Sequence, residues 1–146
     1  MGILLDYGSG SKPKKEYKTS DMTGSPRFDF HIQNYRVQDL ENGEVDSLHC
    51  RNVIHHIRPE DLKKVFREFE RLVRKGGKLI ISEPMEKYFI QNKILDLIWY
   101  RFLYYDRDIY LPREYVDFKD FIDKNEFKLL KVEKDNKNEV LTYKRM

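Results

Sequence analysis

The sequence is poor in cysteine and in long apolar runs, and each shortage excludes a class of protein. One of its 146 residues is cysteine, Cys50, so no disulfide can form within the chain and a reducing compartment is expected. No apolar run approaches the roughly 20 residues of a membrane-spanning helix, and no signal peptide is expected at the amino terminus. These absences together predict a cytoplasmic protein without a membrane span.

An excess of charge of one sign is also missing. The chain has 28 Lys and Arg against 25 Asp and Glu, a net charge of +3, and the two signs are interleaved. Nucleic-acid-binding proteins usually carry a clustered basic face, so a small-molecule partner is favoured over a nucleic acid. Four lysines between Lys12 and Lys18 keep a phosphate patch open as an alternative, although a solvated loop is the simpler interpretation.

What the chain does have is a set of short apolar segments, with one strongly amphipathic stretch before the last of them. The strand-like segments are ILLDYG, EYKTSDM, FDFHIQN, the start of VDSLHCRNVIHHI, and KLIISEP. The spacing of apolar residues predicts a helix that begins at Pro59 and ends at Gly76-Gly77. Strands that alternate with helices predict a mainly parallel sheet in one α/β domain, residues 1–146.

The second half of the chain predicts two more helices and a hairpin. Residues 85–106 form an aromatic-rich stretch of helical spacing, and residues 113–125 are interpreted as another helix. The segments FKLLKVEKDN and EVLTYKRM then predict a C-terminal antiparallel hairpin that turns around residues 136–138. The large rings of helix 88–105 exceed what one face can bury, so they are expected to form an acceptor pocket wall, with a homodimer contact or a membrane surface as the alternatives.

Polar residues follow several predicted strands, where a parallel sheet binds its ligands. Gly8 and Gly10 allow a sharp turn and the close approach of a ligand. Asp21 ends the next strand, where a carboxylate accepts both hydroxyls of a ribose. Gln33 and Asn34 offer amide groups suited to an adenine edge. The connection from Gly10 to Asp21 is too short for a long helix facing a pyrophosphate, which favours a ligand without phosphates.

These segments resemble the class I, Rossmann-like S-adenosylmethionine-dependent methyltransferases, in particular a compact branch that acts on small molecules. LLDYGSG is similar to the first motif of that family, and GSGSKP followed by SDM is similar to a subgroup with a shortened first crossover. VDSLHCRNVIHHI, the helix EDLKKVFREFERLVRKGG and KLIISEP resemble its middle motifs. The resemblance implies a minimal domain that lacks the N-terminal helical cover of many relatives.

The resemblance also implies a role for each residue that matches a motif. The residues matched to contacts with the methionine part of the cofactor are Asp6, Gly8, Ser9 and Gly10. Those matched to the ribose and the adenine are Asp21, Met22, Gln33 and Asn34. Those matched to the space near the transferable methyl group are Cys50, Arg51 and Asn52. Lys12 stands where the longer glycine motif has a third glycine.

The implied function is methyl transfer from S-adenosylmethionine to a small-molecule or biosynthetic-intermediate acceptor. The alternatives are a catalytically weak or inactive binding subunit of the same fold, and an RNA or cap methyltransferase. An oxygen acceptor would need a base, for which the unranked candidates are His49, His55, His56 and Glu83. No metal is expected, because the adjacent residues His55 and His56 point apart and Cys50 is the only thiol.

Overall fold

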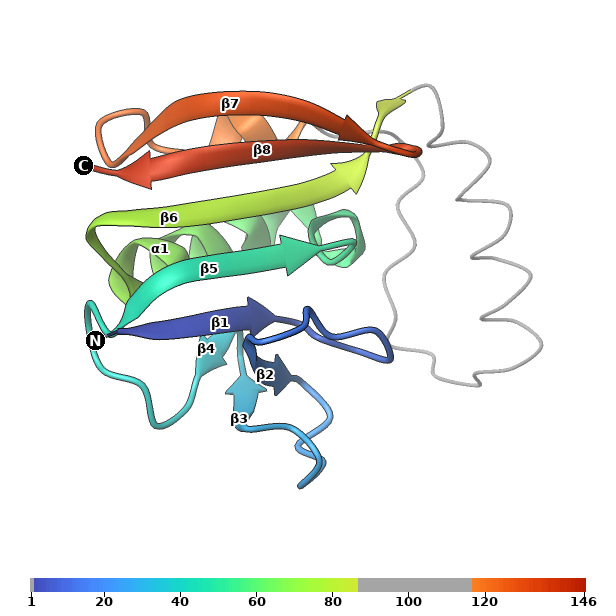
Figure 1. Cartoon of the computed structure of the whole chain (residues 1–146), viewed down its shortest axis with the longest axis vertical. Helices are drawn as coiled ribbons and strands as arrows, with labels where there is room; N and C mark the ends of the chain where they lie inside the picture. Colours follow the sequence, from blue (N-terminus) through green and yellow to red (C-terminus); the bar gives the residue numbers. More distant parts are fainter. Residues whose placement is uncertain (1, 87–116) are drawn as a thin grey trace.

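The computed structural model describes residues 2–86 and 117–146, which form one mixed sheet with a helix on one side (Figure 1). The strand order of this sheet is β4-β3-β2-β1-β5-β6-β8-β7. The strands are β1 (Ile3–Tyr7), β2 (Lys18–Asp21), β3 (Phe30–Gln33), β4 (Arg36–Val37), β5 (Val45–Arg51), β6 (Val73–Pro84), β7 (Phe127–Asp135) and β8 (Asn138–Arg145). The helical elements are η1 (Ile54–His56), η2 (Pro59–Asp61), α1 (Leu62–Leu72) and η3 (Phe118–Phe121).

The sheet is parallel in its centre and antiparallel at both margins. β2 pairs with β1 and β3, and β5 pairs with β1 and β6, all in parallel. The hairpin of β7 and β8 adds to β6 in antiparallel register. This confirms the predicted α/β fold with a mainly parallel sheet and a C-terminal antiparallel hairpin. The strand order reverses between β1 and β5, and ligands of such sheets bind at this point, beyond the carboxyl ends of the strands.

The hydrophobic core lies between the sheet and α1. Alternate residues of β1, β5 and β6 face the helix, among them Tyr7, Cys50 and Ile81, and all three are fully buried. Tyr7 packs edge-on against Phe69 of α1, with 5.0 Å between the ring centroids. Burial of such rings supplies much of the stability of a small domain. The core thus fixes which residues of each strand face away from α1.

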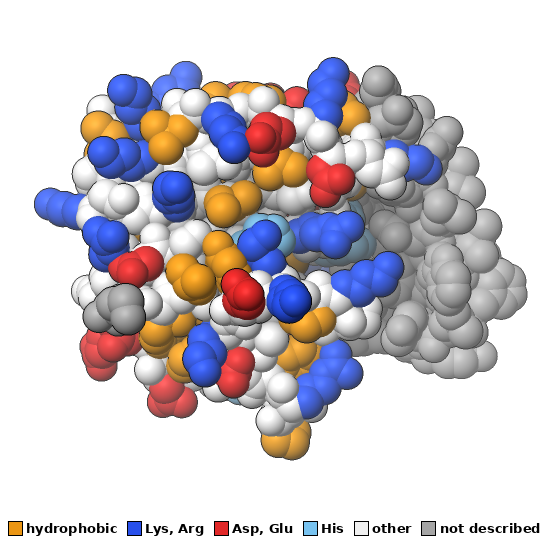
Figure 2. Space-filling model, viewed as in Figure 1, with side chains coloured by type: hydrophobic (Ala, Val, Ile, Leu, Met, Phe, Trp, Pro, Cys, Tyr) orange, Lys and Arg blue, Asp and Glu red, His pale blue; other side chains and the backbone are white. Residues whose placement is uncertain are grey.

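The other face of the sheet carries no helix in the described part of the chain. In Figure 1, α1 lies behind the sheet and this open face points toward the viewer. Figure 2 shows the same face in space-filling form, with Lys and Arg side chains gathered around histidine near its middle. Within residues 2–86 and 117–146, no helix is long and apolar enough to cross a membrane.

The helix that the sequence predicts after Pro59 is present but ends earlier than expected. Its first turn is η2, and α1 ends at Leu72 rather than at Gly76-Gly77. Val73 is already extended and pairs with Val45 at the start of β5. The glycines serve the turn that follows: Gly76 has a φ of +83°, and a Cβ on Gly77 would lie 2.8 Å from the carbonyl oxygen of Asp46. Burial of Val73 against the sheet therefore overrides the helical pattern.

Two further expectations differ from the structure. The predicted helix 113–125 is wrong over its described part, residues 117–125, which contains only the short turn η3. Asp117 and Asp123 accept hydrogen bonds from the backbone N–H groups of Lys119 and Asn125, and such local bonds compete with a helix. The short strand β4, of 2 residues, was not predicted from the sequence either. The aromatic helix predicted over 88–105 lies outside the described residues.

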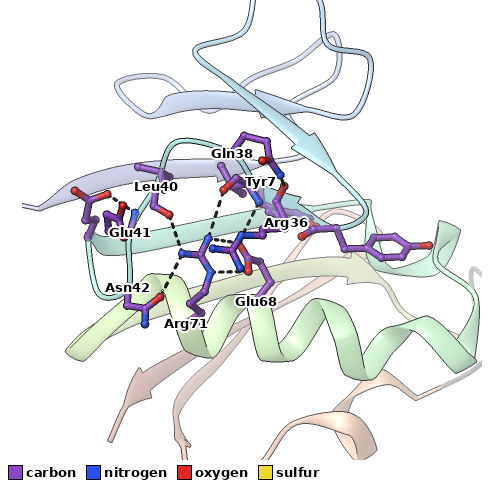
Figure 3. A network of polar contacts seen from close by, with 11 residues as sticks. Tyr7, Arg36, Gln38, Leu40, Glu41, Asn42, Glu68 and Arg71 are labelled. Carbon is purple, nitrogen blue, oxygen red and sulfur yellow. Dashed lines mark hydrogen bonds and ion pairs between the residues drawn. The ribbon is translucent and has the colours of Figure 1, made fainter.

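An ion pair between the buried Glu68 and the partly exposed Arg71 ties α1 to the segment that carries β4 (Figure 3). Glu68 receives two hydrogen bonds from Arg71, of 2.6 and 2.8 Å, and one of 3.0 Å from the backbone N–H of Val37. Arg71 also donates to the carbonyl oxygen of Leu40 at 2.7 Å. The Glu68 hydrogen bonds raise the pKa of the Arg71 guanidinium. This network ties β4, the edge strand of the sheet next to β3, to α1.

Candidate functional site

The loop after β1 depends on two glycines with left-handed backbone. Gly8 has a φ of +71°, and a Cβ there would lie 2.6 Å from a methyl carbon of Val53, in the loop after β5. Gly10 has a φ of +56°, and nothing lies within 4 Å of the position a Cβ would take. Gly8 therefore allows close packing of two loops, whereas Gly10 borders open space at the edge where ligands of such sheets bind.

Asp6 anchors this loop from the open face of the sheet. Its side chain is buried, and one carboxylate oxygen accepts a 2.8 Å hydrogen bond from the backbone N–H of Lys14. The other oxygen lies 3.0 Å from Nδ1 of His49, which is opposite Asp6 in the parallel register of β1 and β5. The sequence predicted Asp6 as a cofactor contact, and the structure places its carboxylate on the loop and on His49.

Two buried serines bind the loop to β2. The Ser9 hydroxyl donates to the carbonyl oxygen of Asp6 and accepts from the backbone N–H of Ser20, at 3.0 and 3.1 Å. The Ser20 hydroxyl donates to the same carbonyl at 2.8 Å. The backbone N–H of Ser9 also bonds within the protein, to the carbonyl oxygen of Ser20 at 2.7 Å, so Ser9 serves the shape of the loop. These bonds fix the short connection from β1 to β2 without a crossover helix.

Asp21 stands at the end of β2, beside this loop. One carboxylate oxygen accepts a 3.0 Å hydrogen bond from the backbone N–H of Gly10, and the other accepts from Thr23 at 3.2 Å. Arg27 donates to the carbonyl oxygen of Gly10 at 2.9 Å, which fixes the same loop from a third side. Met22 follows with an exposed side chain. The structure thus places Asp21, with Met22 next to it in the chain, beside the Gly10 loop.

Gln33 and Asn34 lie at the same edge, one strand further out. β3 runs parallel to β2, and β4 returns antiparallel, with Gln33 opposite Arg36. The two turn residues, Asn34 and Tyr35, have φ values of +51° and +66°, the left-handed pair of a tight hairpin turn. Asn34 therefore also has a structural role in the turn, which was not predicted from the sequence, although Asn tolerates left-handed backbone and is common in turns.

The end of β5 supplies one buried and two exposed residues. Cys50 is fully buried in the core, and this desolvation raises the pKa of its thiol well above the ordinary value. Arg51 and Asn52 are exposed, and Asn52 has a φ of +55°. The side-chain oxygen of Asn52 accepts a 2.9 Å hydrogen bond from Asn138 of β8. A ligand at this edge would meet the side chains of Arg51 and Asn52 but not that of Cys50.

A second histidine–carboxylate pair follows β5. Nδ1 of His55 lies 2.6 Å from one oxygen of Glu83, whose side chain is buried at the end of β6. The other oxygen of Glu83 accepts hydrogen bonds from the backbone N–H groups of Val53 and Ile54, at 3.1 and 2.7 Å. Glu83 thus orients the His55 ring and shapes the loop at once. Of the four base candidates, His49 and His55 each lie against a buried carboxylate.

Two hollows adjoin these residues. The larger, of about 870 Å³, lies on the open face and is lined by Lys12, Pro13, Lys14, His49, Arg51, Ile80, Ser82, Lys131, Glu133, Lys134, Asp135, Val140 and Thr142. The smaller, of about 410 Å³, is lined by Arg51, Asn52, His55, His56, Pro84, Asp135, Asn136, Lys137 and Asn138. Among the described residues, no group of three or more His, Cys, Asp or Glu is placed to hold a metal ion.

Comparison with known proteins gives one sequence match and many structural ones. The family model described as a methyltransferase domain matches residues 5–81, more than half of the chain. No curated protein matches the sequence. A protein from Pyrococcus horikoshii is similar in structure, with a TM-score of 0.68 and 16% identity over 99% of this chain and 82% of that one.

Two other solved structures carry an activity in their names. A SAM-dependent methyltransferase from Methanosarcina mazei has a TM-score of 0.65 and 15% identity, over 98% of this chain and 92% of its own. The 1,6-didemethyltoxoflavin-N1-methyltransferase of Burkholderia thailandensis, solved with its substrate and S-adenosylhomocysteine, has a TM-score of 0.63 and 12% identity, over 99% and 71% of the two chains. At these identities the structural likeness shows the fold alone, whereas the match of the family model over residues 5–81 shows the family.

Proposed function

We propose, from the premise that this chain belongs to the methyltransferase domain family, that it transfers a methyl group from S-adenosylmethionine to a small-molecule acceptor. The cofactor follows from the family and the fold. The residues that hold the cofactor and the class of acceptor are the parts that we add. Both rest on the geometry of the strand ends.

The observation that carries the proposal is the juxtaposition of Gly10 and Asp21. The position of a Cβ on Gly10 is open, so a ligand can approach the backbone there, and the Asp21 carboxylate stands within hydrogen-bond distance of the same residue. A carboxylate beside an accessible backbone fits a ribose whose two hydroxyls need an acceptor. The short connection between them leaves no long helix to face a pyrophosphate, which fits a cofactor without phosphates.

The neighbouring residues extend the same site. Met22 offers an exposed apolar side chain, and Gln33 and Asn34 offer amide groups, both suited to an adenine. On the other side of β1, Arg51 and Asn52 border the space in which we place the methyl group. Ser9 and Asp6 contribute indirectly, since their hydrogen bonds fix the loop that carries Gly8 and Gly10.

When bound, S-adenosylmethionine supplies a methyl group carried on a positively charged sulfur, and S-adenosylhomocysteine is the leaving group of the transfer. The protein's task is therefore to orient the acceptor and to receive any proton that it loses. We assign the proton to His55. It lines the smaller hollow together with Arg51 and Asn52, and Glu83 fixes its orientation at 2.6 Å.

Isothermal titration calorimetry with S-adenosylhomocysteine tests the cofactor site. We expect the wild type to bind, and Asp21→Ala to lose at least tenfold in affinity because both ribose hydroxyls lose a charged acceptor. Asp120→Ala is the matched control, since Asp120 is an exposed carboxylate on η3. Equal affinities of the two variants would overturn the assignment of Asp21, and absence of binding by the wild type would overturn the cofactor site.

A second measurement addresses turnover. Methyl transfer to a fractionated pool of small metabolites, followed with a labelled methyl group, should fall in His55→Gln while S-adenosylhomocysteine binding is retained. Cofactor binding without transfer to any fraction would instead favour the non-catalytic binding subunit. Transfer to RNA alone would replace the small-molecule acceptor with a nucleic acid.

A further inference from the structure

The larger hollow on the open face of the sheet shares only Arg51 with the cofactor site described above. Its floor is formed by strand residues that point away from α1, namely His49 and Arg51 of β5, Ile80 of β6 and Thr142 of β8. Its rim is formed by the loop Lys12–Lys14 on one side and by β7 on the other. This face is the one that Figure 2 shows, with cationic side chains grouped around its centre.

The charges around the hollow are unbalanced. Its cationic side chains are Lys12, Lys14, Arg51, Lys131 and Lys134, and its carboxylates are Glu133 and Asp135. Lys131 pairs with Glu133 at 3.0 Å, so the excess of positive charge lies on Lys12, Lys14, Arg51 and Lys134, which only Asp135 offsets. Cations that converge on one concave surface raise the local concentration of an anion and bind it by charge-assisted hydrogen bonds.

His49 gives the floor of the hollow a positioned ring nitrogen. Its ring is buried, and Nδ1 donates to the Asp6 carboxylate at 3.0 Å, so Nε2 is the nitrogen left for a ligand. Nε2 accepts a hydrogen bond in the neutral ring and donates one to an anion in the imidazolium form. Tyr17 packs edge-on against this ring, with 6.1 Å between the centroids, and its hydroxyl lies 3.0 Å from that of Ser47. Lys14 lies over the Tyr17 ring, with Nζ 5.4 Å from the centroid. Contacts on several sides thus fix the histidine and bring one cation near it.

We propose that this hollow is an anion-binding site, and that it holds a phosphate or carboxylate group of the methyl acceptor. The second part rests on the proposed function. It follows from Arg51, which lines both hollows. An anionic group bound over His49 would leave the rest of the acceptor beside Arg51, next to the smaller hollow with Asn52 and His55.

The size of the hollow favours a small molecule over a nucleic acid. A volume of about 870 Å³ lies within the range of small-molecule sites. The chain as a whole carries a net charge of only +3, and carboxylates interrupt the basic rim, as the Lys131–Glu133 pair shows. A backbone-tracking surface for RNA would need a longer, unbroken basic groove.

Nuclear magnetic resonance on the full chain tests the site with two probes. Inorganic phosphate is titrated at constant ionic strength, and S-adenosylhomocysteine is titrated separately. We expect saturable phosphate-dependent shifts at the amides of Lys14 and His49 and at the His49 ring. S-adenosylhomocysteine should instead shift Gly10 and Asp21. Phosphate shifts that are absent or do not saturate would overturn the anion site even when S-adenosylhomocysteine binds.

Charge-matched variants separate a built site from general attraction. Lys14→Met/Lys134→Met should weaken phosphate binding about tenfold. The control Lys63→Met/Lys75→Met removes the same charge from exposed positions outside the hollow and should change the affinity less than twofold. Equal losses in both pairs would overturn the proposal. His49→Gln provides an independent check, because it should weaken phosphate binding while every lysine around the hollow is kept.

Two outcomes distinguish the inference from the proposed function. Saturable phosphate binding without S-adenosylhomocysteine binding would support the anion site and overturn its assignment to a methyl acceptor. Binding of a single-stranded RNA that displaces phosphate, with a steep dependence on salt, would overturn the small-molecule ligand in favour of a nucleic acid.

Discussion

The backbone N–H of Gly10 donates a 3.0 Å hydrogen bond to the Asp21 carboxylate, so the loop after β1 rests on the side chain that we expect to bind ribose. The Arg27 guanidinium holds the same loop through the carbonyl oxygen of Gly10. Cofactor binding must therefore share the Asp21 carboxylate with the loop or release the loop from it. The Gly10 amide is the natural reporter of this event.

Two substitutions of Asp21 should separate its role in the loop from its role toward a ligand. Asp21→Asn keeps an oxygen that accepts from Gly10, whereas Asp21→Ala removes it. We expect hydrogen exchange of the Gly10 amide to be about tenfold faster in Asp21→Ala and nearly unchanged in Asp21→Asn. Both variants should bind S-adenosylhomocysteine more weakly. Unchanged exchange in Asp21→Ala would mean that this hydrogen bond does not hold the loop.

The two loop glycines should respond differently to the same substitution. Each has a positive φ, which costs an alanine roughly 1–2 kcal/mol. Gly8→Ala adds a clash with Val53 at 2.6 Å, whereas the Cβ of Gly10→Ala enters open space. Urea denaturation should therefore show a larger loss of stability for Gly8→Ala, and calorimetry a loss of cofactor affinity for Gly10→Ala. Equal losses of stability would contradict the packing of Gly8 on Val53.

Removal of the Glu68 carboxylate should destabilise the fold strongly. Glu68→Ala leaves the buried Val37 N–H without an acceptor and the partly exposed Arg71 without its carboxylate, which together cost about 2 kcal/mol of unfolding free energy. Glu68→Gln keeps an acceptor for Val37 and should cost less. Glu60→Ala, at an exposed position of η2, is the control and should change the free energy by less than about 0.5 kcal/mol.

Stability should fall at alkaline pH as buried acids ionise in the unfolded chain. Burial raises the pKa of Cys50 and of Tyr7 well above their ordinary values, and that of Tyr143 to about 12. Between its unfolded and folded pKa, each group keeps its proton in the folded state and loses it on unfolding. Its contribution to the free energy of unfolding is therefore fully present below the unfolded pKa and is lost as pH rises toward the folded pKa. The urea midpoint should decline from about pH 9 upward.

Tyr143→Phe tests the upper part of this range. The variant should be less sensitive to pH than the wild type between pH 10 and about 12, because this ionisation is removed. Cys50→Ala should flatten the lower part near pH 9, after allowance for the cavity that it creates. A wild-type midpoint that does not change up to pH 11 would contradict the shifts of all three groups.

Sequence reasoning predicted the parts of the fold that local pattern determines. The apolar runs of β1, β5 and β6 and the amphipathic stripe of α1 identified their elements, and the order of strands and helices gave a mainly parallel sheet. The strand ends followed from that sheet, because parallel strands place their carboxyl ends at one edge. Asp21 and Gly10 could thus be placed together from the sequence alone.

The remaining features depend on contacts between distant residues. The end of α1 was predicted too late because Val73 pairs with Val45, which no helical pattern reveals. The pairing of Asp6 with His49 depends on the register of β1 against β5, which alternation alone does not specify. The short connection after β1 contains no helix, so it leaves the face of the sheet away from α1 uncovered there. Which face this is becomes clear only once α1 is placed on the other one.

The pairing of Val45 with Val73 also bears on the order in which the chain assembles. β5, α1 and β6 follow one another directly, so their contacts close short loops, at low cost in chain entropy. β8 reaches β6 only from the far end of the sequence. We therefore expect the β5–α1–β6 unit to fold first and to open last, so that the strand ends bearing Arg51 and Glu83 are built on the most persistent part of the molecule.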